Sequence, residues 1–202
     1  MPGYPLIEAY LTGKELKTVA EIDASVSDLM TSARLYMYGL QFTYNPHRMI
    51  LNRVTDVYLL DADGNRRELE DDKLYRVVAD LYSGQMLSAV TKTSYGLLSV
   101  VPKKADGTPI ENFEDVILTD NGGELKAWTA IAHYMESFPD ENGDGIADIP
   151  QYYAGLHERK VVDDSANLVK LIKNPNKYAV MIAGVVLIAI LLVVLLIPVS
   201  YT

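Results

Sequence analysis

The stretch Leu6–Ala24, LIEAYLTGKELKTVAEIDA, decides how the chain begins to fold. Its first residues, Leu6–Leu11, are a short and mostly apolar run, which predicts a β-strand. Thr12 and Glu15 follow with the spacing of a capping box, in which each side chain accepts a hydrogen bond from the other residue's backbone amide. Apolar residues then recur at helical spacing, so a helix is expected over Gly13–Ala24.

Further strands are expected downstream of this unit. Leu35–Tyr44 is rich in aromatic residues and is typical of a strand. Arg53–Leu60 and Arg67–Leu69 are expected to pair as a hairpin, because Asp63-Gly64 supplies the positive φ angle that a tight turn requires. Leu74–Leu81 predicts another strand.

A helix is expected over Glu124–Ser137, after Gly122-Gly123. Its apolar residues share one face, and a position in the core is the favoured interpretation of that face. These residues are Leu125, Trp128, Ile131, Ala132 and Met135. Strands and helices intermix along the chain without a steady β-α-β rhythm, so the expected fold class is α+β.

The tail from Tyr178 to Val199, YAVMIAGVVLIAILLVVLLIPV, contains no charged residue. Its length corresponds to roughly 33 Å of helix, enough to cross a hydrocarbon core of about 30 Å. A buried helix of a globular protein is the alternative, but such helices are rarely apolar on every face. We therefore expect one transmembrane helix over residues 178–199.

Composition and flanking charge bear on where the soluble part resides. The net charge of −9 belongs to the residues before the span, and this argues against nucleic acid as a partner. No cysteine is present, which excludes disulfides and thiolate metal ligands. The first residues lack the features of a signal peptide. Because Lys170, Lys173 and Lys177 precede the span, the positive-inside rule alone would place the domain in the cytoplasm.

Five motifs in order resemble the C-terminal domain of the bacterial 5′-nucleotidase family of metallophosphoesterases. They are Leu11-Thr-Gly-Lys-Glu-Leu-Lys17, Tyr38-Gly-Leu-Gln-Phe-Thr-Tyr44, Lys73-Leu-Tyr-Arg-Val-Val78, Ser94-Tyr-Gly-Leu-Leu-Ser-Val100 and Glu124-Leu-Lys-Ala-Trp128. The last two are similar to a membrane-anchored subgroup on bacterial surfaces. The resemblance implies a mixed-sheet domain over residues 5–153, a charged stalk over 154–177, and a domain outside the cell.

Membership in that family implies a two-domain hydrolase of nucleotide catabolism. Its N-terminal domain holds two divalent metal ions that activate water for attack on phosphorus, and its C-terminal domain binds the nucleoside between aromatic rings. The histidines of this chain, His47, His133 and His157, lack the spacings of such a metal site. We therefore expect no catalytic residue here, and either a truncated gene or the C-terminal portion of a longer enzyme.

The family's second stacking ring normally follows the strand matched by Leu74–Leu81, in a glycine-rich loop that this sequence lacks. Gly84 and the segment Ser94-Tyr95-Gly96 occupy the corresponding region. Tyr95 is the first candidate for the ring that binds substrate, and Tyr82 is the second. The alternative is that Tyr95 packs at the entrance of a strand.

An acidic loop follows Pro139. Asp140, Asn142, Asp144 and Asp148 occupy positions 1, 3, 5 and 9 of a Ca²⁺-binding loop, with glycine at position 6. Gln151 stands where an EF-hand has its bidentate glutamate, so a Ca²⁺ site over residues 140–151 and a solvated acidic turn both remain open. For the whole chain, the favoured function is nucleoside binding and membrane anchoring; a membrane-tethered scaffolding module without catalysis is the alternative.

Overall fold

The structure is a computed structural model that describes residues 3–27, 34–61, 63–93 and 98–196. It consists of two compact units, which are considered one at a time. The first comprises Met1–Val19 and Leu69–Glu158, and the second comprises Ala20–Glu68 and Arg159–Thr202. Helix α1 (Gly13–Val26) runs from the first unit into the second.

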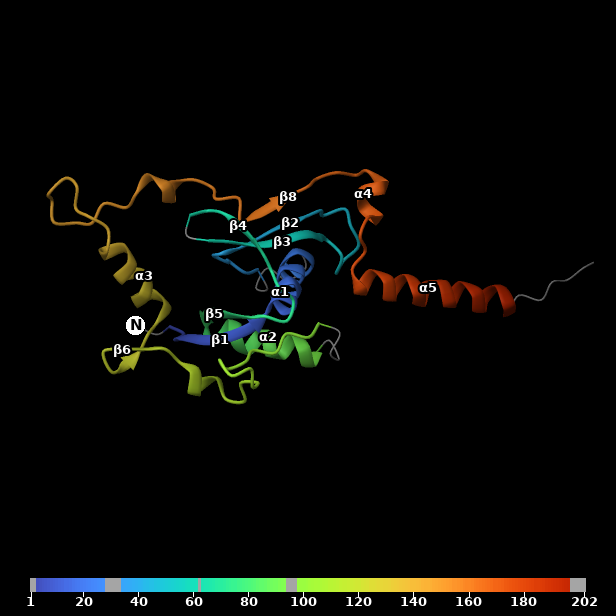
Figure 1. The fold of residues 1–202 in the computed structure, drawn as a ribbon, viewed down its shortest axis with the longest axis horizontal. Helices are drawn as coiled ribbons and strands as arrows, with labels where there is room; N and C mark the ends of the chain where they lie inside the picture. Colours follow the sequence, from blue (N-terminus) through green and yellow to red (C-terminus); the bar gives the residue numbers. More distant parts are fainter. Residues whose placement is uncertain (1–2, 28–33, 62, 94–97, 197–202) are drawn as a thin grey trace, which may run out of the picture. The chain divides into compact units, whose positions relative to one another are not determined.

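The first unit is built on an antiparallel pair of strands, β1 (Leu6–Thr12) and β5 (Leu74–Asp80), in which Leu6 lies opposite Asp80. Helix α2 (Leu81–Thr93) follows β5 directly (Figure 1). A small core of Ile7, Ala9, Ile110 and Phe113 forms on the inner face of β1. The remaining elements are η2 (Phe113–Val116), β6 (Thr119–Asp120), β7 (Gly123–Glu124), α3 (Ala127–Glu136) and η3 (Gln151–Ala154).

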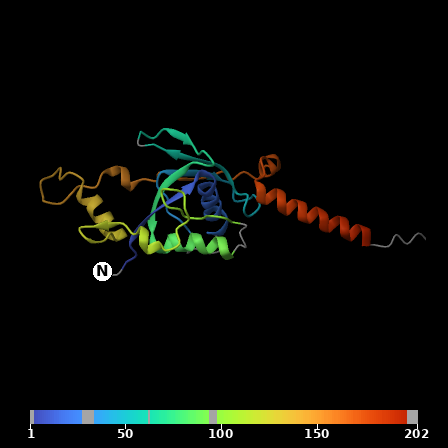
Figure 2. The same ribbon diagram turned by 60° about the horizontal axis from the view of Figure 1, so that its bottom comes forward.

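The second unit contains a four-stranded sheet in the order β4-β3-β2-β8. Its strands are β2 (Leu40–Tyr44), β3 (Val54–Leu60), β4 (Arg66–Glu68) and β8 (Lys160–Val162). The neighbours β4, β3 and β2 pair antiparallel, whereas β8 runs parallel to β2. The sheet is therefore mixed, and the fold class is α+β as expected. Figure 2 shows this sheet after a 60° turn.

The start of α1 forms as its sequence predicts. The amide of Thr12 donates to Oε2 of Glu15 at 2.8 Å, and the amide of Glu15 donates to Oγ1 of Thr12 at 3.2 Å. Both hydrogen bonds of the capping box are thus present. Gly13 is required between them, because a Cβ atom there would lie 2.3 Å from the carbonyl oxygen of Glu70.

Three expected elements differ in the structure. Strand β2 begins only at Leu40, after Gly39 has turned the chain with a φ of +81°. The strand expected over Leu74–Leu81 ends at Asp80, because Leu81 is the first residue of α2. The predicted burial of the α3 face is wrong: α3 has no buried residue, and Trp128 is 45% exposed. Amphipathic spacing predicted the helix, but within the described first unit no second layer covers its apolar face.

The segment expected as a stalk, residues 154–177, contains more regular structure than its charged composition indicates. Strand β8 joins the sheet, with Phe42 opposite Lys160 and Tyr44 opposite Val162. Helix α4 (Leu168–Ile172) follows, and α5 (Lys177–Leu196) begins after it. The division into domain, stalk and membrane span stays a prediction, but part of the stalk belongs to the second unit.

Helix α5 covers residues 178–196 of the expected membrane span, and the last three residues of that span lie outside the described residues. Over Lys177–Leu195 its mean hydropathy is 3.1, and 11% of this window is buried. Among the helices that the structure describes, this one is long and apolar enough to cross a membrane. Such low burial distinguishes α5 from the core helix of a soluble protein.

Candidate functional site

Tyr82, the second candidate for a substrate-stacking ring, lies at the start of α2. Its side chain is 43% exposed, and its ring lies 5.5 Å from the ring of Tyr4 at an interplanar angle of 30°. Tyr4 is 55% exposed. Two partly exposed aromatic rings are therefore adjacent on the first unit, one before β1 and one after β5.

The spacing of this pair determines how a base could bind. Stacked carbon atoms lie about 3.5–4 Å apart, so a base held between two rings needs them about 7–8 Å apart. The Tyr4 and Tyr82 rings are closer than that. A base would therefore stack on an outer face of the pair, as on an aromatic platform.

Tyr4 was not singled out in the sequence, because the resemblance starts beside it at Pro5. Its position follows from pairing of the backbone: its carbonyl oxygen accepts a hydrogen bond from the amide of Ala127, and that of Pro5 accepts from Leu81. These bonds hold residues 4–5 next to the start of α2. A tyrosine just before the first strand was the available signal.

Tyr95 and Gly84 are the other residues that the sequence singled out in this region. Tyr95, with Ser94 and Gly96, lies outside the described residues. Gly84 is buried, and a Cβ atom there would lie 2.4 Å from Cδ1 of Ile7. Its lack of a side chain thus allows α2 to pack against β1, rather than opening the surface to a base.

The acidic loop folds around its own backbone. Oδ1 and Oδ2 of Asp140 accept hydrogen bonds from the amides of Gly143 and Gly145, at 2.6 and 2.8 Å. The bond from Gly145 lowers the pKa of Asp140; burial opposes it, and the bond from Gly143 adds to the lowering. The amide of Glu141 donates to Asp148 at 2.8 Å. These hydrogen bonds favour the ionised form of Asp140, and whether the loop binds Ca²⁺ stays a prediction.

Within the described residues, no three His, Cys, Asp or Glu side chains gather closely enough to hold a metal ion. The histidines have other neighbours. His47 Nε2 lies 2.7 Å from Asp164, His133 Nδ1 lies 3.8 Å from Asp120, and His157 stacks on Tyr152 at 4.1 Å. These single contacts do not form a dinuclear centre.

The strongest polar arrangement of the first unit lies at the start of α1. Lys103 Nζ donates to both carboxylate oxygens of Glu15, at 2.6 and 2.7 Å, and the Val101 amide donates to Oε1. Burial alone would raise the pKa of Glu15, but the hydrogen bonds from Lys103 and the amides of Thr12 and Val101 outweigh it, so the pKa is lowered. This group is structural, since it has no unsatisfied position for substrate.

Comparison with known families identifies the N-terminal part of the chain. The sequence model of the 5′-nucleotidase C-terminal domain matches residues 3–90, which contain β1, α1, the antiparallel strands of the second unit, β5 and the first ten residues of α2. Residues 3–90 belong to the 5′-nucleotidase C-terminal domain family. The match includes Tyr4 and Tyr82, but neither α3 nor the acidic loop.

A solved nucleotidase structure agrees with this family in fold. The 5′-nucleotidase precursor from Thermus thermophilus is 21% identical, with a TM-score of 0.51, and the match covers 79% of this chain. It covers 25% of the Thermus chain, so this chain spans about a quarter of that protein's length. The NAD nucleotidase of Haemophilus influenzae is 23% identical over 48% of this chain and 17% of its own, with a TM-score of 0.37. No curated protein sequence matches the chain.

Proposed function

We propose that this chain is the substrate-binding C-terminal domain and membrane anchor of a 5′-nucleotidase-like hydrolase. The observation that carries the proposal is the family match over residues 3–90, in a chain whose α5 has the length and hydropathy of a membrane span. The substrate would be a nucleotide or a related phosphoester. Its base would stack on Tyr82 or Tyr95, and the outer faces of the Tyr4–Tyr82 pair support the first of these.

In this proposal, metal-dependent chemistry belongs to an N-terminal metallophosphoesterase domain, on the same polypeptide or on a separate chain. Two observations support the division of labour. No cluster of metal ligands occurs within the described residues, and the chain spans a quarter of the Thermus nucleotidase. The divalent metals would be held by that domain, and this chain would supply binding and position.

Calorimetric titration of the detergent-solubilised chain with adenosine 5′-monophosphate tests the binding role. A stacking ring contributes enough that Tyr82→Ala or Tyr95→Ala should weaken binding about tenfold. Tyr36→Ala is the matched control, because Tyr36 is 89% exposed and lies in the other unit. Binding that is unchanged in both test variants would remove these tyrosines from the site. Hydrolysis of the nucleotide by this chain alone with Mn²⁺ would contradict the assignment of catalysis elsewhere.

We place the two soluble units outside the cell, in agreement with the surface-anchored subgroup. The lysines before α5 favour the opposite orientation by the positive-inside rule. Protease treatment of intact cells decides between them. With an antibody against the soluble units as the probe, external protease should remove the signal from intact cells. A signal that is lost only after the cells are lysed would instead place the units in the cytoplasm.

The acidic loop has a smaller role in the proposal, as a Ca²⁺ site that makes the segment between α3 and η3 rigid. Four oxygen-bearing side chains at the required spacing support it: Asp140, Asn142, Asp144 and Asp148. Calorimetry with millimolar Ca²⁺ should show heat that disappears in Asp140→Asn together with Asp144→Asn. No heat in the unaltered chain would leave a solvated turn.

A membrane-tethered scaffolding module is the second candidate. The exposed apolar face of α3 favours it, because Trp128, Ile131 and Met135 are 45–57% exposed on one helix. The mass of the native protein separates the two. A polypeptide much larger than 22.4 kDa supports the hydrolase, and one of that mass without a separate catalytic partner supports the scaffold.

A further inference from the structure

Helix α4 carries apolar side chains that the second unit leaves uncovered. Its sequence is LVKLI, and Leu168, Val169 and Ile172 are 76%, 69% and 74% exposed. In the same unit, the turn before β3 exposes Met49 and Ile50, at 41% and 45%. Large aliphatic side chains so exposed on two adjacent segments mark a surface that contacts something other than water.

Arg48 fixes α4 to that turn. It is only 6% exposed and donates from Nη1 to the carbonyl oxygen of Lys170 at 2.9 Å, and from Nη2 to that of Lys173 at 3.0 Å. Its Nε donates to the carbonyl oxygen of Asn52 at 2.6 Å. One buried cation therefore holds the last carbonyl groups of α4 against the segment that carries Met49 and Ile50, which makes α4 part of the unit rather than a loose linker.

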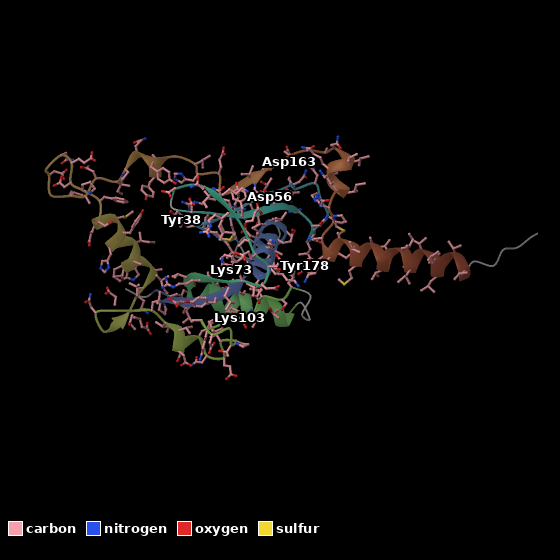
Figure 3. The ribbon with its side chains drawn as sticks, in the orientation of Figure 1. Tyr38, Asp56, Lys73, Lys103, Asp163 and Tyr178 are labelled. Atoms are coloured by element: carbon pink, nitrogen blue, oxygen red, sulfur yellow. The ribbon has the colours of Figure 1, made fainter. Side chains whose placement is uncertain are left out.

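The same turn holds the first turn of α5. Oδ1 of Asn52 accepts from the amide of Asn176 at 2.9 Å, and Oδ1 of Asn176 caps the amides of Tyr178 and Ala179 at 3.0 Å. Tyr178 and Ala179 are buried, at 5% and 8% exposure, whereas Val180 is 57% exposed. The side chains of α5 are thus mostly exposed from Val180 onward, directly after the residues that contact the rest of the second unit. Figure 1 shows α5 projecting as a single helix, and Tyr178 in its first turn is labelled in Figure 3.

The short connection between α4 and α5 keeps α4 near that exit. Four residues separate Ile172 from Lys177, so an extended chain between them spans at most about 18 Å. The hydrogen bonds of Arg48 and Asn52 attach both ends of this connection, Lys173 and Asn176, to the same turn before β3. If α5 enters a bilayer at Val180, the aliphatic side chains of α4 and of the turn lie at the headgroup layer.

The charges at this surface match anionic lipid. Lys170, Lys173 and Lys177 are exposed within eight residues, on a protein whose net charge is −9. The nearest acidic side chains are paired: Asp163 contacts Lys170 at 3.3 Å, and Asp164 contacts His47 at 2.7 Å. Lysines beside aliphatic residues are the combination that binds the surface of an anionic bilayer.

We infer that Met49, Ile50, Leu168, Val169 and Ile172 form a juxtamembrane surface that rests in the headgroup layer of the bilayer spanned by α5. Lys173 and Lys177 bind its anionic phosphates. The inference rests on the proposed membrane anchorage and adds that the second unit is held against the bilayer at a fixed height.

Single-cysteine labelling tests this directly, because the full chain contains no cysteine. An environment-sensitive fluorophore is placed at Ile172→Cys, Ile50→Cys and, within α5, Leu187→Cys. The full chain is reconstituted into phosphatidylcholine vesicles with and without phosphatidylglycerol, and quenching by nitroxide-bearing lipids is measured. Asp63→Cys is the control, since Asp63 is exposed in the hairpin at the opposite end of β3.

Lipid quenching at positions 172 and 50 should exceed that at position 63 at least about twofold, and phosphatidylglycerol should increase it. Lys173→Gln with Lys177→Gln should remove that increase, whereas Arg67→Gln on β4 should not. Quenching at 187 with none at 172 and 50 would overturn the juxtamembrane surface and leave the anchorage intact. Absence of quenching at 187 would overturn both. Fluorophore self-quenching at 172 without lipid quenching would instead assign the surface to a second copy of the chain.

Discussion

Helices α1 and α3 reverse the usual relation between polarity and burial. Helix α1 buries acids, with Glu15, Glu21 and Asp23 only 9%, 4% and 1% exposed, whereas α3 has no buried residue and exposes its tryptophan. Both were expected from apolar residues at helical spacing. The difference shows that spacing predicts a helix, while partners from distant segments decide which of its residues are buried.

The buried acids of α1 contact a cation and hydrogen-bond donors from distant segments. Asp23 pairs with Lys160 at 2.6 Å and accepts a hydrogen bond from the amide of Leu35 at 2.7 Å. Glu21 accepts from Ser25 and from the amides of Arg53 and Val54, at 2.7–2.9 Å. No corresponding partners cover the apolar face of α3 among the described residues. Four predictions test this contrast, from the largest expected effect to the smallest.

Asp23→Ala should destabilise the protein most, by about 4 kcal/mol, because it removes the ionic partner of the partly buried ammonium of Lys160 and the acceptor of the Leu35 amide. Chemical denaturation followed by circular dichroism measures this. Asp71→Ala is the matched control, since Asp71 forms an exposed pair with Lys17 and should cost under about 1 kcal/mol. Equal losses in the two variants would mean that burial of the acid makes no difference.

Glu15→Ala should cost about 3 kcal/mol, because it removes one half of the capping box and the partner of Lys103. Since the pKa of Glu15 is lowered on folding, its stabilising effect is present above the ordinary carboxyl pKa and is lost as the pH falls through the folded value. The stability of the variant should therefore not show the loss that protonation of Glu15 causes in the unaltered protein at acidic pH. A loss of stability that does not depend on pH would contradict the ionic role.

Glu21 should affect the pH dependence of stability in the direction opposite to Glu15, because its pKa is raised on folding rather than lowered. Glu21→Gln tests this. Burial raises the pKa of Glu21, and hydrogen bonds from Ser25 and from the amides of Val54 and Arg53 only partly offset it. Between the unfolded and folded pKa values the native state binds more protons, so stability falls as the pH rises through this range. The glutamine variant should lose that slope, whereas Glu68→Gln on the exposed strand β4 should retain it. The same slope in both variants would exclude Glu21 as its source.

Trp128→Ala should have the smallest effect on folding, under about 1 kcal/mol, because the side chain is 45% exposed and little of it is removed from water. Thermal unfolding measures this, with Phe42→Ala as the comparison, since Phe42 is 1% exposed and should cost about 4 kcal/mol. A large loss for Trp128→Ala would show that the α3 face is covered in the native protein.

Local signals in the sequence predicted the local structure well. The capping box of Thr12 and Glu15 marked the start of α1, and Gly64 adopts the positive φ of +80° expected between β3 and β4. Strand β8 could not be predicted in the same way. It is three residues long in a charged segment, and its partner β2 lies more than a hundred residues earlier.

The candidate site was predicted only in part, for the same reason. Tyr82 was recognised from its place after the strand Leu74–Leu81. Tyr4 reaches it through the pairing of β1 with β5, which a linear sequence does not show. Gly84 was placed in the region that corresponds to the family's glycine-rich loop, but its packing against Ile7 depends on how closely α2 approaches β1.

The contacts of Arg48 have a mechanical consequence. A pull along α5 would be transmitted through Asn176 and Asn52 to Arg48, and from there to the carbonyl groups at the end of α4. Further strain would load the parallel pair of β8 and β2 in shear. Drag on a molecule tethered in this way would therefore strain the four-stranded sheet of the second unit.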